Sequence, residues 1–295
     1  MVGQRIVVRH LLPGEVGPSG GPAATDVLGV CTAWQDGTVT VRREDGTVAV
    51  IDIAQIVSGK PVPPRRSVRH RVSPRDAQLR ALAMWPSLET APLGDWTLRW
   101  SAVDTARRAN SVLAMGPAGV PEAVERVAAH YTALGRRPIA CVEPDSDEDE
   151  LFRSRGWVPH TPQPDSLFQM AGVAAVRRAL AAPPALDVRL EGAGDRVRAT
   201  IGGSAGGWAT GLASYADDWV GLQRIEVDPA HRRQGLALAV IGALLEWGAE
   251  RGAGTAYLQV TADNGPALAL YARIGFVTHH AYRYLNPVAA SGPAT

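Results

Sequence analysis

Apolar and polar residues alternate in short runs over the first part of the chain, and this pattern predicts an all-β domain. A strand that buries one face carries apolar side chains at every second position. Four such runs lie at 6–10, 27–33, 39–43 and 48–53. The turn signals Asp36-Gly37 and Asp45-Gly46 predict hairpins, and the Gly- and Pro-rich stretch 13–23 predicts a loop between the first two strands. We therefore expect a small barrel over residues 1–60.

Prolines and arginines dominate residues 61–72, which predicts a linker. Pro61, Pro63 and Pro64 favour an extended polyproline II conformation, and the arginines keep the segment solvated. A basic segment of this kind could also bind an acidic partner, but a solvated linker is the commoner explanation.

Residues 73–182 mix helical and strand patterns. The run 121–134 places apolar residues on one helical face and ends at Gly135. A strand pattern follows at 139–142. The double proline Pro183-Pro184 marks the end of this region.

Residues 183–288 begin with strand patterns and then alternate between helix and strand. Strand patterns lie at 188–190, 197–201, 208–214, 219–227, 256–261 and 276–285, and helical patterns at 236–251 and 266–273. Such an order is typical of a mixed central sheet flanked by helices. The predicted fold class is therefore α/β (α+β), preceded by the small all-β domain, with a flexible tail at 289–295.

An internal repeat relates the two α/β regions. Each copy has a helix, a strand, an acidic loop and then an aromatic residue four positions before a glycine: Phe152 before Gly156, and Tyr271 before Gly275. The first copy has no basic loop before its helix, where residues 115–119 stand instead. We interpret residues 73–182 as a degenerate copy that kept the fold and lost a phosphate site.

Composition and charge narrow the classes of function. The chain has 295 residues, 46% of them hydrophobic and 20% charged, which favours two or three folded domains. A formal net charge of +1 gives no general attraction to nucleic acid. Cys31 and Cys141 lie in separate apolar runs, which predicts buried thiols and no metal site. With no signal peptide and no apolar span of membrane length, we expect a soluble cytoplasmic protein without a membrane partner.

The segment 228–237 has the composition of an anion-binding loop. Pro229 ends the preceding strand, because proline cannot donate a ladder hydrogen bond. Arg232 and Arg233 add charge, and Gly235 leaves room at the first backbone N–H groups of the next helix. Such a helix start suits a phosphate or pyrophosphate. A solvated basic turn would contain the same residue types, so the loop alone does not distinguish an anion-binding site from such a turn.

Three linked segments resemble the GNAT superfamily of acetyl-CoA-dependent N-acetyltransferases over about residues 188–285. Arg232-Arg233-Gln234-Gly235-Leu236-Ala237 resembles its pyrophosphate loop, and 257–260 resembles the next strand. Residues 264–276 fit its pattern Asn-x-x-Ala-x-x-Leu-Tyr-x-x-x-Gly-Phe. The whole chain, with an SH3-like barrel, a degenerate GNAT-like region and a C-terminal GNAT domain, resembles a family from high-GC bacteria sometimes labelled N-acetylglutamate synthase.

The resemblance implies acetyl-CoA as co-substrate, no metal, and a role for each matched residue. The loop 232–237 would bind the pyrophosphate. The backbone of Ile225 and Val227 would bind the pantetheine where two strands splay apart, and Asn264 and Ala267 would also contact the cofactor. Tyr271 would be the general acid that protonates the leaving thiolate. Alternatively, Tyr271 is a core aromatic residue and Asn264 is only a helix cap.

The general base is the least determined part of the site. Some relatives place a glutamate where this chain has Gln259, and an amide cannot accept the proton of the amine. Glu226, on the strand before the loop, is the first candidate. The other candidates are His231, His279 and His280. A base acting through a water molecule is an equal alternative.

Three hypotheses of function follow. The first is an N-acetyltransferase acting on a primary amine of a small molecule or peptide, with amino acids such as glutamate among the acceptors. The second is a non-catalytic protein that binds acyl-CoA for regulation or scaffolding. The third, a nucleic-acid-associated module using the barrel and the basic run 65–71, is weakest because the net charge is near zero. The sequence leaves open whether the protein forms a homodimer.

Overall fold

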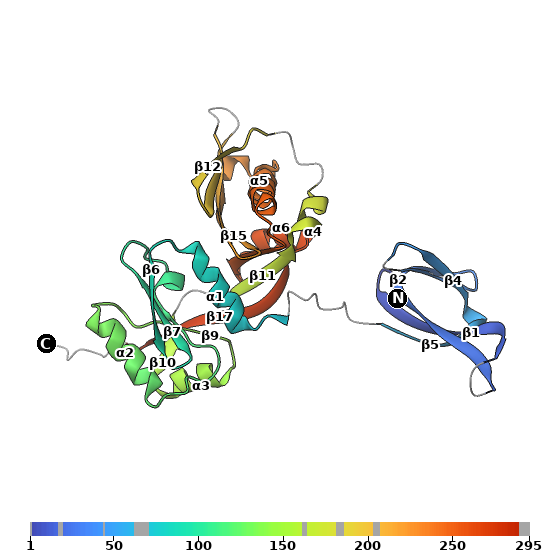
Figure 1. Cartoon of the computed structure of the whole chain (residues 1–295), viewed down its shortest axis with the longest axis horizontal. Helices are drawn as coiled ribbons and strands as arrows, with labels where there is room; N and C mark the ends of the chain where they lie inside the picture. Colours follow the sequence, from blue (N-terminus) through green and yellow to red (C-terminus); the bar gives the residue numbers. More distant parts are fainter. Residues whose placement is uncertain are drawn as a thin grey trace. The chain divides into compact units, whose positions relative to one another are not determined.

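The chain divides into two compact units, residues 1–67 and 68–295 (Figure 1). The computed structural model describes residues 2–16, 20–43, 45–61, 71–160, 164–180, 186–202 and 207–288. Most of the predicted linker at 61–72 and the predicted tail at 289–295 lie outside the described residues.

The N-terminal unit is an antiparallel sheet, which confirms its predicted all-β character. Its elements are β1 (Arg5–Val16), β2 (Pro22–Gln35), β3 (Thr38–Arg42), β4 (Val48–Asp52), η1 (Ile53–Gln55) and β5 (Ile56–Pro61). The strand order is β4-β3-β2-β1-β5. The expected loop at 13–23 is shorter than predicted, because β1 and β2 continue their pairing past a bulge as far as Val16 and Pro22. Alternating side chains such as Ile6, Val8 and Val41 form the core.

The second unit is built on one extended sheet. Its strands are β6 (Leu88–Leu93), β7 (Trp96–Ser101), β8 (Val112–Leu113), β9 (Ala140–Val142), β10 (Trp157–Pro159), β11 (Ser166–Gly172), β12 (Arg189–Ala193), β13 (Arg196–Ile201), β14 (Ala209–Ala216), β15 (Trp219–Val227), β16 (Thr255–Thr261) and β17 (Val277–Pro287). The order is β12-β13-β14-β15-β16-β11-β17-β9-β8-β7-β6, and β10 also pairs with β17.

Helices cover this sheet, and local signals explain where several of them begin. The helical elements are α1 (Pro74–Arg80), η3 (Ala81–Met84), η4 (Arg107–Ala109), α2 (Ala123–Ala133), α3 (Asp147–Ser154), α4 (Val173–Ala179), η5 (Pro229–His231), α5 (Leu236–Glu250) and α6 (Gly265–Arg273). Ser73 caps α1 by accepting a hydrogen bond from the Asp76 N–H at 3.0 Å. Ser146 caps α3, whose first turn is acidic and so complements the helix dipole.

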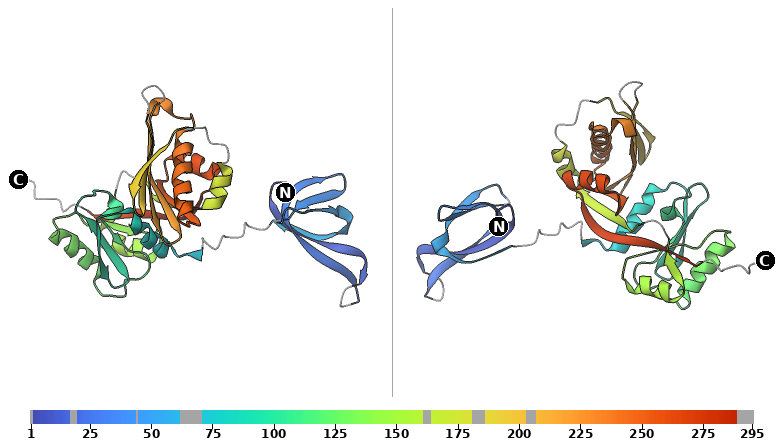
Figure 2. Two further views of the ribbon diagram at one scale, coloured as in Figure 1. Left: turned by 45° about the horizontal axis from the view of Figure 1, so that its top comes forward. Right: turned by 180° about the vertical axis from the view of Figure 1, so that it is seen from behind.

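Two strands join the halves of the second unit. We call the predicted regions 73–182 and 183–288 the first half and the C-terminal half. The first part of β17 pairs with β11, and its last part pairs with β9 and β10. Figure 2 shows β17 as one curved strand that runs from the C-terminal half into the first half. β11 lies between β16 and β17, although it precedes the domain start predicted at residue 183. The two halves therefore share one continuous sheet.

The two faces of the sheet are covered differently. α2 and α3 pack on one face of the first half, and α5 and α6 pack on the same face of the C-terminal half. Fully buried side chains of α5, such as Ile241 and Leu244, contribute roughly 1.5–3 kcal/mol each to holding that helix in place. The opposite face, which we call the inner face, carries aromatic side chains such as Phe168, Tyr257 and Tyr282, and α1 with η3 covers part of it.

His280 is buried on the inner face beneath α1. Its ring stacks on Phe168 with centroids 5.0 Å apart, and its Nε2 lies 3.1 Å from the Gln78 side-chain nitrogen. Its Nδ1 lies 2.7 Å from Nδ1 of His279. Burial, together with the neighbouring His279, lowers the pKa of His280 to about 3.

Acid should therefore destabilise this unit in part through His280. An unfolded histidine has a pKa of about 6.5, so the folded state binds fewer protons below that pH. The stability that neutral His280 provides is complete above about pH 6.5 and is lost toward about pH 3, at about 1.4 kcal/mol per pH unit. In denaturant titrations, His280→Phe should reduce the slope of unfolding free energy between about pH 6 and pH 4. Equal slopes in variant and parent would refute this assignment.

Candidate active site

The loop after β15 has an ordered backbone with two left-handed residues. Asp228 accepts a hydrogen bond from the Ala230 N–H at 3.0 Å, and its second carboxylate oxygen lies 2.9 Å from Nδ1 of His231. Arg233 and Gly235 then adopt φ angles of 64° and 86°. Left-handed residues in such an alternation turn successive N–H groups to one side, which makes an anion-binding concavity.

The donors of this loop are available to a ligand. Within the described residues, the backbone N–H groups of 232–237 have no acceptor, and α5 has its first helical bond at Ala239. The guanidinium groups of Arg232 and Arg233 are exposed and form no ion pair with any described residue. Unpaired N–H groups, two positive charges and the positive end of a helix dipole fit a pyrophosphate.

The two strands beside the loop separate at the level of the site. β15 and β16 are parallel neighbours only as far as the pair Leu222 and Leu258. Arg224, with a φ of 51°, forms a bulge, and the register with β14 shifts there. Beyond it Ile225–Val227 have no partner on β16, so the strands separate where the splay was expected and the backbone of β15 has no β16 partner there.

The next two candidate residues belong to α6: Asn264 lies just before its first residue, and Tyr271 lies on the helix itself. Tyr271 is 8% exposed, and its ring centroid lies 5.9 Å from that of Phe276. Its hydroxyl has no hydrogen-bond partner among the described residues, and burial raises its pKa. The phenol is therefore in its proton-donating form at neutral pH. Asn264 accepts a hydrogen bond from the Ala267 N–H at 3.2 Å, so it caps α6.

The candidate bases differ in their surroundings. Glu226 is exposed, and it projects to the inner face because the neighbouring Ile225 packs toward α5. His231 is bound to Asp228, and His279 Nε2 lies 2.9 Å from the carbonyl oxygen of Val72. His280, with its low pKa, is a weak base at neutral pH. Glu226 keeps its place as first candidate.

Two neighbours of the site were not identified from the sequence. Arg224 forms the bulge, and nothing local to the sequence distinguishes it from other arginines. Tyr282 donates a hydrogen bond of 2.6 Å to the side-chain oxygen of Gln259. This contact spans 23 residues of sequence, so only the pairing of β11 with both β16 and β17 brings it about.

Residues 190–285 match the family model described as "Probable histone acetyltransferase Rv0428c C-terminal". The fold of 77% of the chain also superposes on 98% of a GCN5-related N-acetyltransferase from Kribbella flavida, with a TM-score of 0.50. The sequence identity is 16%, so this second likeness concerns the fold. This part of the chain therefore has the GNAT fold.

The chain matches only part of the length of each curated relative. "Uncharacterized N-acetyltransferase YobR" of Bacillus subtilis (strain 168) is 40% identical over 77 residues, which are 25% of this chain and 31% of that protein. "Streptothricin acetyltransferase" of Streptomyces lavendulae is 34% identical over 88 residues, 29% of this chain and 47% of that protein. The chain thus spans less than half of either relative. Residues 1–60 match a model described as "Rv0428c N-terminal Sm-like domain".

The cap of α6 provides a quantitative test. Asn264→Ala should lower the free energy of unfolding by about 1 kcal/mol and should also weaken acetyl-CoA binding, because the helix that presents Tyr271 would fray at its start. Ser73→Ala, at the cap of α1, should cost similar stability and leave acetyl-CoA binding unchanged. Denaturant titration and calorimetry measure the two effects. Unchanged binding in Asn264→Ala would restrict Asn264 to a capping role.

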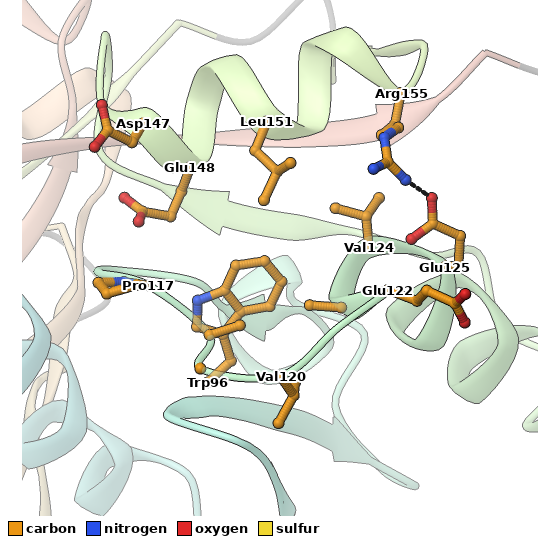
Figure 3. Close-up of a pocket in the computed structure, with 13 residues that line it drawn as sticks. Trp96, Pro117, Val120, Glu122, Val124, Glu125, Asp147, Glu148, Leu151 and Arg155 are labelled. Atoms are coloured by element: carbon orange, nitrogen blue, oxygen red, sulfur yellow. Dashed lines mark hydrogen bonds and ion pairs between the residues drawn. The ribbon is translucent and has the colours of Figure 1, made fainter.

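The first half has elements that correspond to β15, β16 and α5, but the charge at the start of its helix is negative instead of positive. β8 runs parallel to β9, and Glu122 before α2 is left-handed with a φ of 52°, like Gly235 before α5. A cavity of about 450 Å³ lies there, with Trp96 at its base (Figure 3). Its charged lining residues are Glu122, Glu125, Asp147, Glu148 and Arg155, and Arg155 is paired with Glu125. Carboxylates would repel a pyrophosphate, which agrees with a lost phosphate site.

No helix within the described ranges is long and apolar enough to span a membrane. Among the same residues, no group of three or more His, Cys, Asp or Glu side chains could hold a metal ion.

Proposed function

We propose that this protein is an acetyl-CoA-dependent N-acetyltransferase that acetylates a primary amine of a small molecule or peptide. One observation carries the proposal: the unpaired N–H groups of 232–237 lie at the end of the strand that separates from its neighbour. Donors that suit a pyrophosphate thus lie beside a free strand edge, which supports the binding of an extended acyl-CoA molecule. The family match at 190–285 supports the same activity.

Each group of the site has a role in the transfer. The loop binds the pyrophosphate, and the free backbone of Ile225 and Val227 orients the thioester. The amine nitrogen attacks the acetyl carbonyl carbon, a C–N bond forms and the C–S bond breaks. The amine gives up a proton to Glu226 or to a water beside it, and Tyr271 donates its proton to the leaving sulfur. Holding amine and thioester together supplies a large part of the acceleration.

A second candidate function rests on Gln259. This amide stands where a base would be expected, and its oxygen already accepts a hydrogen bond from Tyr282. A protein that binds acyl-CoA without turnover, for regulation or scaffolding, would tolerate this arrangement. The protonated phenol of Tyr271 favours the enzyme.

A thiol-release assay with acetyl-CoA distinguishes the two candidates. The panel should contain amino acids, including glutamate, as well as polyamines, aminoglycosides and short peptides. We expect release of free coenzyme A with at least one class of amine. Tight binding of acetyl-CoA without release of coenzyme A across the whole panel would contradict the acetyltransferase hypothesis and support the hypothesis of a non-catalytic acyl-CoA-binding protein.

A further inference from the structure

The cavity of the first half contains a buried carboxylate without a partner. Glu148, on α3, lines this cavity and is only 9% exposed. No described residue forms a hydrogen bond or an ion pair with its side chain. Burial, together with the negative charge of Glu148, raises the pKa of the neighbouring Glu143. A carboxylate withdrawn from water is costly unless a cation or hydrogen-bond donors offset its charge. Glu148 therefore offers a negative charge to a ligand of the cavity.

The arginines on and beside α3 pair with other carboxylates. Arg153 and Arg283 pair with Asp149, at 2.8 and 2.9 Å. Arg155 pairs with Glu125. The charged groups that line the cavity are thus four carboxylates and one guanidinium, and that guanidinium is already paired. The electrostatic potential of such a lining attracts cations and repels anions.

The wall of the cavity is apolar between two charged ends. Figure 3 shows the carboxylate of Glu148 at one end and that of Glu122 at the other, with Leu151 and Trp96 between them. Nε1 of Trp96 donates a hydrogen bond of 2.7 Å to the Gly116 carbonyl oxygen, so this ring has no free N–H for an anion. An indole does attract a nearby cation through its π-system. The cavity volume of about 450 Å³ is within the range of small-molecule sites, roughly 300–1,000 Å³.

We propose that this cavity binds a linear organic diammonium ion, with one ammonium group against Glu148 and the other against Glu122. The proposal does not rest on acetyl transfer, because the cavity belongs to the half without the loop 232–237. Glu122 has the left-handed conformation before α2 that Gly235 has before α5. The degenerate copy has thus kept a cavity at the start of its helix and exchanged the charge of the ligand that the cavity selects.

The lining favours a diammonium ion over other cations. Among the described residues, no group of three or more His, Cys, Asp or Glu side chains could hold a metal ion, so the carboxylates are too dispersed for a metal site. A methylene chain between two ammonium groups would contact the apolar side chains of Val124 and Leu151, which a hydrated inorganic cation would leave unused. A single ammonium group would satisfy only one end of the cavity.

Matched five-carbon ligands provide the test. Isothermal titration of the full chain should compare 1,5-diaminopentane with 1-aminopentane, 1,5-pentanediol and glutarate. The diamine should bind most tightly and the monoamine more weakly, whereas the neutral diol and the anionic glutarate should show no measurable binding. Glu148→Gln removes the buried charge with little change of shape and should weaken binding of the diamine by about 10- to 100-fold. The control is Glu150→Gln, an exposed position on the same helix outside the cavity lining, which should bind like the parent.

A second variant tests the other end of the cavity and does not depend on how Glu148→Gln folds. Glu122 is exposed, so Glu122→Gln should fold like the parent. It should lower the affinity for the diamine to about that for the monoamine, and it should leave the affinity for the monoamine unchanged. Absence of diamine binding to the parent, equal binding of the diol, or a diamine affinity that neither Glu148→Gln nor Glu122→Gln reduces would overturn the proposal. None of these measurements involves acetyl-CoA, so they leave the test of the proposed acetyltransferase separate.

Discussion

Tyr271→Phe should lower turnover by about 100- to 1,000-fold and leave the affinity for acetyl-CoA unchanged. The phenol is buried, and burial raises its pKa, so it carries its proton at neutral pH. Phenylalanine keeps the packing against Phe276 and removes only the hydroxyl. Without an acid, the sulfur must leave as a thiolate, which raises the barrier of bond cleavage but not the free energy of cofactor binding.

Tyr257→Phe is the matched control for this result. Tyr257 is also a buried phenol with a raised pKa, but it stacks on Phe168 on the inner face instead of lying on α6. Its substitution should leave turnover near the parental level. Single-turnover measurements with acetyl-CoA bound in advance isolate the chemical step. If Tyr271→Phe and the parent have equal rates, Tyr271 is not the acid and its role is packing.

Gly235→Val should weaken the binding of acetyl-CoA by about 100-fold. Gly235 has a φ of 86°, a conformation that a β-branched residue rarely adopts, and the added side chain would lie among the N–H donors of the loop. Hydrogen bonds to a charged group contribute roughly 1.5 kcal/mol or more each. Loss of two of them, about 3 kcal/mol, corresponds to a weakening of about 100-fold.

Gly252→Val controls for backbone strain. Gly252 follows the other end of α5 and has a φ of 90°, so valine there imposes similar strain far from the loop. Its effect on the free energy of unfolding should resemble that of Gly235→Val, and acetyl-CoA binding should persist. Calorimetry on both variants decides the matter. An unchanged affinity of Gly235→Val for acetyl-CoA would contradict the assignment of the loop as a pyrophosphate site.

The residues of the candidate site could be predicted from the sequence because their signals are local. Pro229 ends β15, Gly235 supplies the left-handed residue before α5, and Asn264 caps α6 within three residues of its partner. Each feature depends on a few neighbouring residues, as backbone conformation and helix capping do. The GNAT fold itself was expected from the resemblance of three linked segments within about residues 188–285 to that superfamily.

The pairing between the halves could not be predicted in the same way. β11 precedes the predicted domain start and still lies in the C-terminal part of the sheet, because Phe168 pairs with both Gln259 and His280. Which strand inserts between two others depends on tertiary packing, which alternation of apolar residues does not encode. Arg108 illustrates the consequence, since its bond to Tyr282 spans 174 residues of sequence.

The number of acetyl-CoA molecules bound per chain tests the central claim most directly. The loop 232–237 has free donors and positive charge, whereas the equivalent cavity of the first half has carboxylates at Glu122 and Glu148. Isothermal titration of the full chain with acetyl-CoA should therefore give one site per chain. Two sites, or a single site that Gly235→Val leaves unchanged, would contradict the assignment of the active site to the C-terminal half.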